Sequence, residues 1–180
     1  MQSSYEERAR AFIHQIFPFI VDRIFDIYWV QKAVADFNIK YHRNVKVCYG
    51  DARIALITSD YVIKYDYDNE IIEDIGGCEQ ERELYEQAVQ DGFDYLFAKT
   101  TRYDYNCISF YIMPRINGVG KYGKQYRHAD SFMTTEELAW CDDHKLVDLH
   151  WQNYGFRNGK VCIIDYAYIE HNNDYDDEEY

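Results

Sequence analysis

The chain has 180 residues, a length typical of one compact domain or of two small lobes. Apolar residues make up 47% of the sequence, enough for a hydrophobic core, and 32 acidic against 19 basic residues give a net charge of −13. Because an acidic protein repels phosphate backbones, direct binding to nucleic acid is not expected. The sequence has no apolar run long enough to cross a membrane and no secretory signal, and its five cysteines form no close pair. We therefore expect a cytoplasmic protein with reduced thiols and no membrane contact.

Helices at the N-terminus are followed by short strands. Residues 4–37 carry the apolar spacing of two packing helices, and Pro18 is expected to end or kink the first of them. The next segment has the period of strands and contains turn residues, which predicts an antiparallel meander with strands at 45–49, 53–58 and 61–65. The later elements expected from the pattern are a helix at 78–90, strands at 95–101 and 107–113, and a helix at 134–145.

Two segments in the second half carry no predicted element. A glycine-rich segment at 117–127 contains the pattern G-x-G-x-x-G at 118–123, but no apolar helix follows it, so we interpret it as a loop and not as a dinucleotide-binding motif. Its basic residues could attract an acidic substrate; they are Lys121, Lys124 and Arg127. Residues 170–180 hold six acids and no Lys or Arg, and we expect them to form a solvated tail.

The segment 148–167 predicts a β-hairpin that ends in oxygen-bearing side chains. Asn158-Gly159 between apolar residues is a strong signal for a two-residue turn. With that turn, Asn153 lies opposite the residue before Asp165, so an amide and a carboxylate meet at the open end of the hairpin. Such a pair could share one Mg²⁺, with water and phosphate as its other ligands, and Asp148 could reach the same point from the preceding loop. The alternative is that these three side chains only cap turns and loops.

A lysine interrupts the third predicted strand. Strand alternation places Val62 and Lys64 on one face, and a lysine among apolar residues needs an anion or must extend to solvent. In the helix at 78–90, Glu81 lies on the apolar face and Glu83 on the polar one. A buried Lys64 and a buried Glu81 would each be costly alone but would stabilise each other as a pair. The alternative is that both side chains are exposed.

Taken in chain order, these residues carry a resemblance to a known fold. Lys64 in a third strand, Glu81 in the next helix, D-L-H-x-x-N at 148–153 and I-D at 164–165 resemble the protein-kinase-like fold, in the form found in aminoglycoside phosphotransferases and atypical kinases. The whole pattern most resembles the small kinase-like proteins of tailed bacteriophages. It spans residues 45–167 and implies an α+β, minimal two-lobed fold with a small antiparallel sheet lobe and a strongly truncated C-terminal lobe, preceded by N-terminal helices.

The resemblance also implies how the chain is divided. The expected parts are an N-terminal helical segment (1–40), a kinase-like N-lobe (41–114), a truncated C-lobe with the catalytic loop and the metal-binding hairpin (115–169), and the acidic tail (170–180).

Roles for single residues follow from the resemblance, in a protein that uses ATP and Mg²⁺. Lys64 would hold the α- and β-phosphates of ATP, and Glu81 would orient Lys64. Asp148 would be the catalytic residue that accepts the proton of the attacking hydroxyl, and Asn153 and Asp165 would hold Mg²⁺. The other nucleotide-binding residues would be Val62 and Met113 beside the adenine, and Gly50 in the loop that covers the phosphates.

The implied function is phosphoryl transfer from ATP to a hydroxyl, with a host protein as the expected substrate if the chain is a bacteriophage protein acting in the host cytoplasm. Only 15 residues follow Asp165, so a substrate platform would have to come from the N-terminal helices, a partner, or a second copy in a homo-oligomer. The alternative is a catalytically inactive kinase-like protein that inhibits a host protein, for example a nucleic-acid-binding one, through its acidic surface. A single glycine in the phosphate-covering loop, and Tyr166-Ala167 in place of Phe-Gly after Asp165, favour this alternative.

Overall fold

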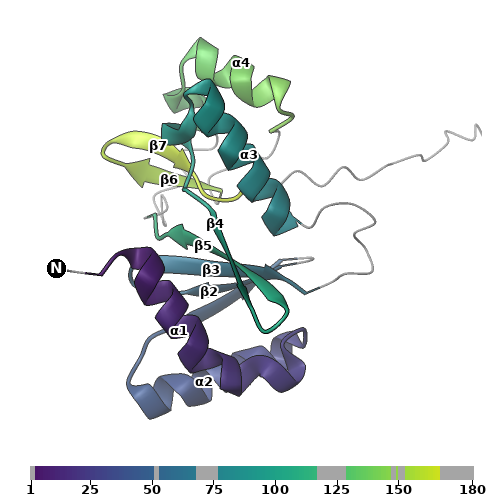
Figure 1. Ribbon diagram of the computed structural model, residues 1–180. Coiled ribbons are helices and arrows are strands. Elements are labelled where there is room, and N and C mark those ends of the chain that lie inside the picture. The colour runs from purple at the N-terminus through teal and green to yellow at the C-terminus, as the bar shows by residue number, and fades with distance from the viewer. Residues whose placement is uncertain are drawn as a thin grey trace, which may run out of the picture.

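The computed structural model of the chain describes residues 3–50, 53–67, 77–116, 129–146, 149 and 153–166. They form an α+β fold with a five-stranded antiparallel sheet, a separate two-stranded hairpin, and helices on both faces of the sheet (Figure 1). The helices are α1 (Tyr5–Ile20), α2 (Ile27–Tyr41), α3 (Gly77–Asp91) and α4 (Thr135–Asp143), with short 3-10 turns η1 (Val21–Arg23), η2 (Asp94–Leu96) and η4 (Ala129–Phe132). The strands are β1 (Lys46–Tyr49), β2 (Arg53–Ile57), β3 (Tyr61–Asp66), β4 (Thr101–Tyr105), β5 (Ile108–Pro114), β6 (Tyr154–Arg157) and β7 (Lys160–Ile163).

Helix α1 begins at a capping box. The Ser4 hydroxyl accepts a hydrogen bond from the Glu7 N–H, and the Glu7 carboxylate accepts one from the Ser4 N–H. Such a cap typically stabilises a helix by about 1 kcal/mol.

Pro18 lies inside α1 and does not end it, so an end of the helix at Pro18, one of its two expected effects, is wrong. The helix continues because Ile16, Phe17 and Ile20 are buried around the proline, and their burial outweighs the loss of one backbone hydrogen bond. The break between the two helices comes at η1, after which the Asp26 side chain caps α2 by accepting from the Trp29 N–H.

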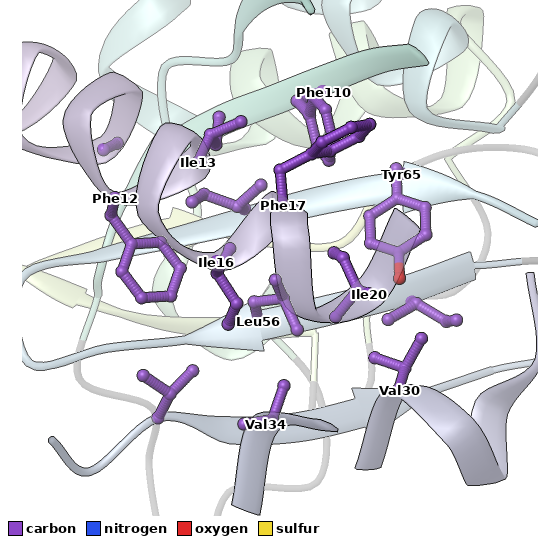
Figure 2. Packing of buried hydrophobic residues seen from close by; sticks show 14 of the residues in the cluster. Phe12, Ile13, Ile16, Phe17, Ile20, Val30, Val34, Leu56, Tyr65 and Phe110 are labelled. Atoms are coloured by element: carbon purple, nitrogen blue, oxygen red, sulfur yellow. The ribbon is translucent and has the colours of Figure 1, made fainter. Parts of the chain in front are cut away.

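Helices α1 and α2 cover one face of the sheet and form the main core with it (Figure 2). In β3, Tyr61, Ile63 and Tyr65 point into this core, which leaves Val62 and Lys64 on the opposite face, as strand alternation predicts. Each fully buried side chain of this size contributes about 1.5–3 kcal/mol. The core residues labelled in Figure 2 are Phe12, Ile13, Ile16, Phe17, Ile20, Val30, Val34, Leu56, Tyr65 and Phe110.

The predicted antiparallel meander of three strands is confirmed. Strand β1 pairs with β2 and β2 with β3, and the full strand order is β1-β2-β3-β5-β4. In this register Lys64 lies opposite Ala55 of β2 and Tyr111 of β5, at the centre of the sheet. The predicted strand at 107–113 corresponds to β5, which lies one residue further along the chain.

Helix α3 crosses the second face of the sheet. Near its start, the Glu79 carboxylate accepts a hydrogen bond of 2.7 Å from the Tyr111 hydroxyl and lies 3.5 Å from Arg102. Its C-terminal half belongs to a second core, in which Ala88 is buried together with side chains of η2, α4 and the β6–β7 hairpin. Helix α3 therefore connects the sheet with the hairpin.

The predicted strand at 95–101 is wrong. Asp94–Leu96 form a 3-10 turn, and the strand of this region, β4, begins only at Thr101. Leu96, Phe97 and Ala98 are all buried, but they precede Thr101, the first residue of this region that pairs in the five-stranded sheet. They pack towards the hairpin, where the Ala98 N–H donates to the Ile163 carbonyl at 2.8 Å.

Two expectations from composition concern the whole chain. No helix in the described ranges is both long and apolar enough to cross a membrane. All five cysteines are free thiols, with Cys48 and Cys107 exposed and the other three buried.

Candidate functional site

Lys64 is a buried cation at the centre of the second sheet face. Its side chain is 9% exposed, and its Nζ donates to both carboxylate oxygens of Glu81, at 2.7 Å (Oε1) and 3.0 Å (Oε2). The same Nζ donates to the Ile164 carbonyl at 3.0 Å. The ammonium group thus joins the sheet, helix α3 and the chain that follows the hairpin.

Glu81 has no exposed surface, and the predicted buried pair with Lys64 is confirmed. Helical spacing also places Glu83 correctly, since its side chain is 47% exposed. Besides Lys64, Glu81 Oε1 receives Arg53 Nη1 at 2.8 Å and the Tyr166 N–H at 3.4 Å. A buried carboxylate with several donors is stabilised in place.

Arg53 of β2 belongs to the same cluster and was not predicted from the sequence. Its Nη1 contacts Glu81, and its Nη2 lies 2.9 Å from Asp165 Oδ1. The β2–β3 register contains the signal that could have revealed it, because Ala55 lies opposite Lys64 and Arg53 is two residues away on the same face.

The hairpin forms as predicted around Asn158 and Gly159, which both have positive φ (54° and 78°), as a type I′ turn requires. Its pairing runs from Arg157↔Lys160 to Tyr154↔Ile163. Beyond the last pair, the Asn153 carbonyl accepts from the Ile164 N–H at 2.8 Å and from the Asp165 N–H at 3.3 Å. Asn153 and Asp165 are thereby brought together at the open end of the hairpin, in line with the prediction.

The electrostatics of this cluster centre on Asp165, whose side chain is 38% exposed. Burial alone would raise the pKa of Asp165, but Lys64, 3.8 Å away, and Arg53 overcome it and lower the pKa to about 2. Burial opposes the charged form of Lys64, whereas Glu81 and Asp165 together raise its pKa, so the ammonium stays charged. Burial raises the pKa of Glu81, against the two cations beside it. With all four groups ionised, two positive charges balance two negative ones.

Val62 and Met113, the side chains predicted to lie beside adenine, are paired across β3 and β5. Met113 is buried in a small cluster with Ala98 and Cys162, against which Val62 and Ile164 pack. This apolar patch adjoins the charged cluster, because Val62 precedes Lys64 on the same strand face and Ile164 supplies the carbonyl bonded to Lys64.

Gly50, the residue predicted to lie over the phosphates, directly follows β1. Its N–H donates to the Arg53 carbonyl at 3.0 Å, and its carbonyl accepts from the Tyr67 hydroxyl at 3.0 Å. Nothing lies within 4 Å of a Cβ built at Gly50, so space around this backbone does not require glycine.

Several predicted residues lie outside the described part of the chain. These are the catalytic candidate Asp148, the glycine-rich segment with Lys121, Lys124 and Arg127, and the acidic tail. Leu149, next to Asp148, is described, and its carbonyl accepts from the Ala129 N–H at 3.0 Å.

The described residues can supply part of a site for a hard divalent cation. Asp165 offers a partly exposed carboxylate and Asn153 a side-chain amide, which are oxygen ligands of the kind that Mg²⁺ uses together with water and phosphate. Within the described ranges, no group of three or more His, Cys, Asp or Glu residues could hold a metal ion.

Comparisons with known proteins find similarity among solved structures. No family model matches the chain, and no curated protein matches it. Among solved structures, the chain is similar to a kinase from Legionella pneumophila, Lpg2603 bound to IP6, with 17% sequence identity and a TM-score of 0.45. The similarity covers 72% of this chain and 51% of the Legionella chain, so this chain spans about half the length of that neighbour. Because this similarity does not establish a family, we base the function on the chain's own residues.

Proposed function

We propose that the chain is a kinase-like phosphotransferase that uses ATP and Mg²⁺ to transfer a phosphoryl group to a hydroxyl. The observation that carries the proposal is the buried Lys64, bonded to both oxygens of Glu81 and 3.8 Å from Asp165. A sheet, a helix and a hairpin each contribute one of these three groups, far apart in the chain. Phosphoryl transfer needs fixed cations opposite phosphate oxygens and little covalent chemistry from the protein, and a lysine held by a buried carboxylate meets that need.

In this proposal the residues have separate roles. Lys64 binds the α- and β-phosphates and Glu81 orients it, while Asp165 and Asn153 hold the metal ion. When bound, Mg²⁺ would neutralise phosphate charge and orient the triphosphate. Asp148 accepts the proton of the attacking hydroxyl.

The adenine would lie on the apolar patch of Val62 and Met113, with Gly50 near the phosphates. Residues 41–114 and 115–169 would form the two lobes around the nucleotide, and 1–40 and 170–180 the flanking parts.

We assign the phosphoacceptor to a host protein, on the sequence resemblance to bacteriophage kinase-like proteins. A transferase of this kind would act in the host cytoplasm.

The direct test is incubation with Mg²⁺ and γ-labelled ATP, with and without host lysate. We expect label on the chain or on a lysate protein, and loss of that label in Asp148→Ala and Asp165→Ala. Asp148→Ala should keep the rise in melting temperature caused by ATP and Mg²⁺, since it removes the base and not the binding site. Absence of both label and thermal stabilisation would contradict the proposal.

The alternative function is a kinase-shaped protein that binds a host protein without turnover. The Arg53–Asp165 ion pair of 2.9 Å favours it, because the expected metal ligand already has a cationic partner. ATP stabilisation without transfer to any acceptor, together with capture of a basic host protein by the acidic chain, would support this alternative.

A further inference from the structure

A separate groove lies on the other side of the sheet from Lys64, between α1, the α2–β1 connection, the β2–β3 turn and the end of β5. It has a volume of about 480 Å³, within the usual range of small-molecule sites. Its apolar lining includes the aromatic rings of Phe12 and Tyr61, both largely buried in the main core, and the smaller Ala11 and Val45. Its charged lining consists of three arginines and one aspartate: Arg8, Arg43, Arg115 and Asp60.

The charge of this groove is opposite to that of the whole chain, whose net charge is −13. Arg8 and Asp60 form an ion pair of 3.1 Å, so their charges cancel. Arg43 and Arg115 have no carboxylate within ion-pair distance in the part of the chain that the structure describes, which leaves two positive charges at one groove.

A polar atom of the groove also lacks a partner. Arg8 Nε is buried and has no hydrogen-bond acceptor among the described residues, although the same guanidinium bonds the Ser3 carbonyl and Asp60. Because Nε itself has almost no exposed surface, a ligand in the groove would not reach it, so Arg8 belongs to the wall of the groove and not to its anion-binding groups.

The wall that carries Arg43 is held in place before any ligand binds. The Asn38 side chain both donates to and accepts from the backbone of Val45, at 2.8 and 2.9 Å, and the Asn38 carbonyl accepts from the Arg43 N–H at 3.1 Å. Residue 42 has the left-handed conformation (φ 52°) that ends α2 and turns the chain towards the groove.

The opposite wall is equally ordered. The Thr58 hydroxyl donates to the Tyr61 carbonyl at 2.9 Å, and the Arg115 guanidinium donates to the Thr58 carbonyl at 2.7 Å. The Arg115 N–H donates to the Asp60 carbonyl at 2.9 Å. The backbones that carry both cations are thus ordered, and the Arg115 guanidinium is also held by the Thr58 carbonyl, which lowers the entropic cost of binding a ligand between the two walls.

We propose that this groove binds a small phosphate monoester, with its phosphate between Arg43 and Arg115 and its carbon skeleton on Phe12 and Tyr61. Guanidinium groups suit phosphate because they present several N–H donors in a plane and remain charged at all relevant pH values. The apolar floor favours an ester with a ring or carbon chain over the free ion. The site is independent of the Lys64 cluster, which lies on the opposite face of the sheet.

Calorimetric titration of the full chain with phenyl phosphate tests the proposal, with inorganic phosphate and benzoate as reference ligands. We expect phenyl phosphate to bind more tightly than either, because only it has both the phosphate and the ring. Arg43→Gln and Arg115→Gln should each weaken its binding by about tenfold, in proportion to one charge-assisted hydrogen-bonding group. Arg43→Gln is the cleaner variant, because the Arg43 side chain has no bond within the described residues that its loss would break.

Two matched variants locate the ligand. Lys46→Gln removes an exposed cation from the neighbouring strand β1 outside the groove and should leave the affinity unchanged. Lys64→Met should also leave it unchanged, whether or not the chain is a phosphotransferase. Equal binding of benzoate, unchanged affinity in Arg43→Gln, or loss of binding in Lys46→Gln or in Lys64→Met protein shown by its melting curve to be folded would each overturn the proposal.

Discussion

Arg53 holds Asp165 through one carboxylate oxygen: its Nη2 lies 2.9 Å from Oδ1, the oxygen that also faces Lys64 Nζ at 3.8 Å. The same guanidinium bonds Glu81 with its other terminal nitrogen. The described groups therefore form a closed arrangement of two cations and two anions without any ligand. In the proposed function, a nucleotide with its metal ion would bind against this arrangement, and Arg53 would set how readily Asp165 takes a metal.

Arg53→Gln should make Asp165 a better metal ligand, because a cation beside a carboxylate competes with the metal for the same charge. We expect the concentration of Mg²⁺ or Mn²⁺ that gives half of the maximal rise in melting temperature to fall by on the order of tenfold. The variant should also lose about 1–3 kcal/mol of stability, since Glu81 and Asp165 each lose a donor.

Arg82→Gln is the matched control for this prediction. Arg82 is likewise ion-paired, with Glu79 and Glu86 on α3, and makes no described contact with Asp165. The Arg82→Gln variant should leave the metal concentration needed for stabilisation unchanged. If Arg53→Gln needed more metal than the wild type, Arg53 would orient Asp165 and would not compete with the metal.

The Lys64–Glu81 pair gives a second prediction. Lys64→Met should abolish the thermal stabilisation by ATP and should destabilise the fold by about 3 kcal/mol, because Arg53, which is partly exposed, is then the one cationic partner that Glu81 keeps among the described residues. Glu81→Gln should weaken ATP stabilisation, because Lys64 loses the carboxylate that orients it.

Glu83→Gln on the exposed face of the same helix should change neither property. ATP stabilisation that depends on Glu83 and not on Glu81 would contradict the assignment of the pair.

The parts of the site that could be predicted from the sequence depend on local periodicity. Helical spacing placed Glu81 inside and Glu83 outside, and the Asn-Gly turn fixed the hairpin register as far as Asn153. Both follow from geometry within about ten residues of chain, where period and turn type leave few alternatives.

The parts that could not be predicted depend on contacts between distant segments. Arg53 could be placed on the face of Lys64 only once the β2–β3 register is known, and its bond to Asp165 depends on how the hairpin sits against the sheet. The sequence pattern places Phe97 in a strand at 95–101, whereas it forms an isolated bridge with Ile163 of the hairpin. In both cases tertiary packing decided the structure and local propensity did not.

The lowered pKa of Asp165 predicts how stability depends on pH. Its folded-state pKa of about 2 lies below the ordinary value of 3.8, so the ionised carboxylate stabilises the folded state above pH 3.8, and this contribution is lost as the pH falls towards 2. The difference in free energy of unfolding between the wild type and Asp165→Asn should be constant above that window and shrink within it. Urea unfolding of both proteins at several pH values measures the difference, and a difference that grows on acidification would contradict the ion pair.

The turn between β4 and β5 offers a stabilising substitution away from the site. Asn106 and Cys107 connect the pair Tyr105↔Ile108 with positive φ values of 49° and 64°. Because a side chain strains this conformation at Cys107, Cys107→Gly should raise the free energy of unfolding by about 1 kcal/mol. Cys48→Gly in strand β1 is the control and should lower it, since glycine weakens a regular strand. If Cys107→Gly is less stable than the wild type, the contacts of the Cys107 side chain stabilise the turn by more than its backbone conformation strains it.

The turn of the β6–β7 hairpin links stability to the site. Gly159 has φ 78°, and nothing lies within 4 Å of a Cβ built on it, so a side chain there acts through backbone strain alone. Gly159→Val should cost about 1–2 kcal/mol, and Gly159→Asn less, because asparagine tolerates the left-handed region better than a β-branched residue. Since Asn153 fixes Asp165 through the open end of this hairpin, the ATP concentration needed for half-maximal thermal stabilisation should rise in the same order. If Gly159→Val lowers stability but leaves that concentration unchanged, the hairpin contributes to the fold without positioning Asp165 for the nucleotide.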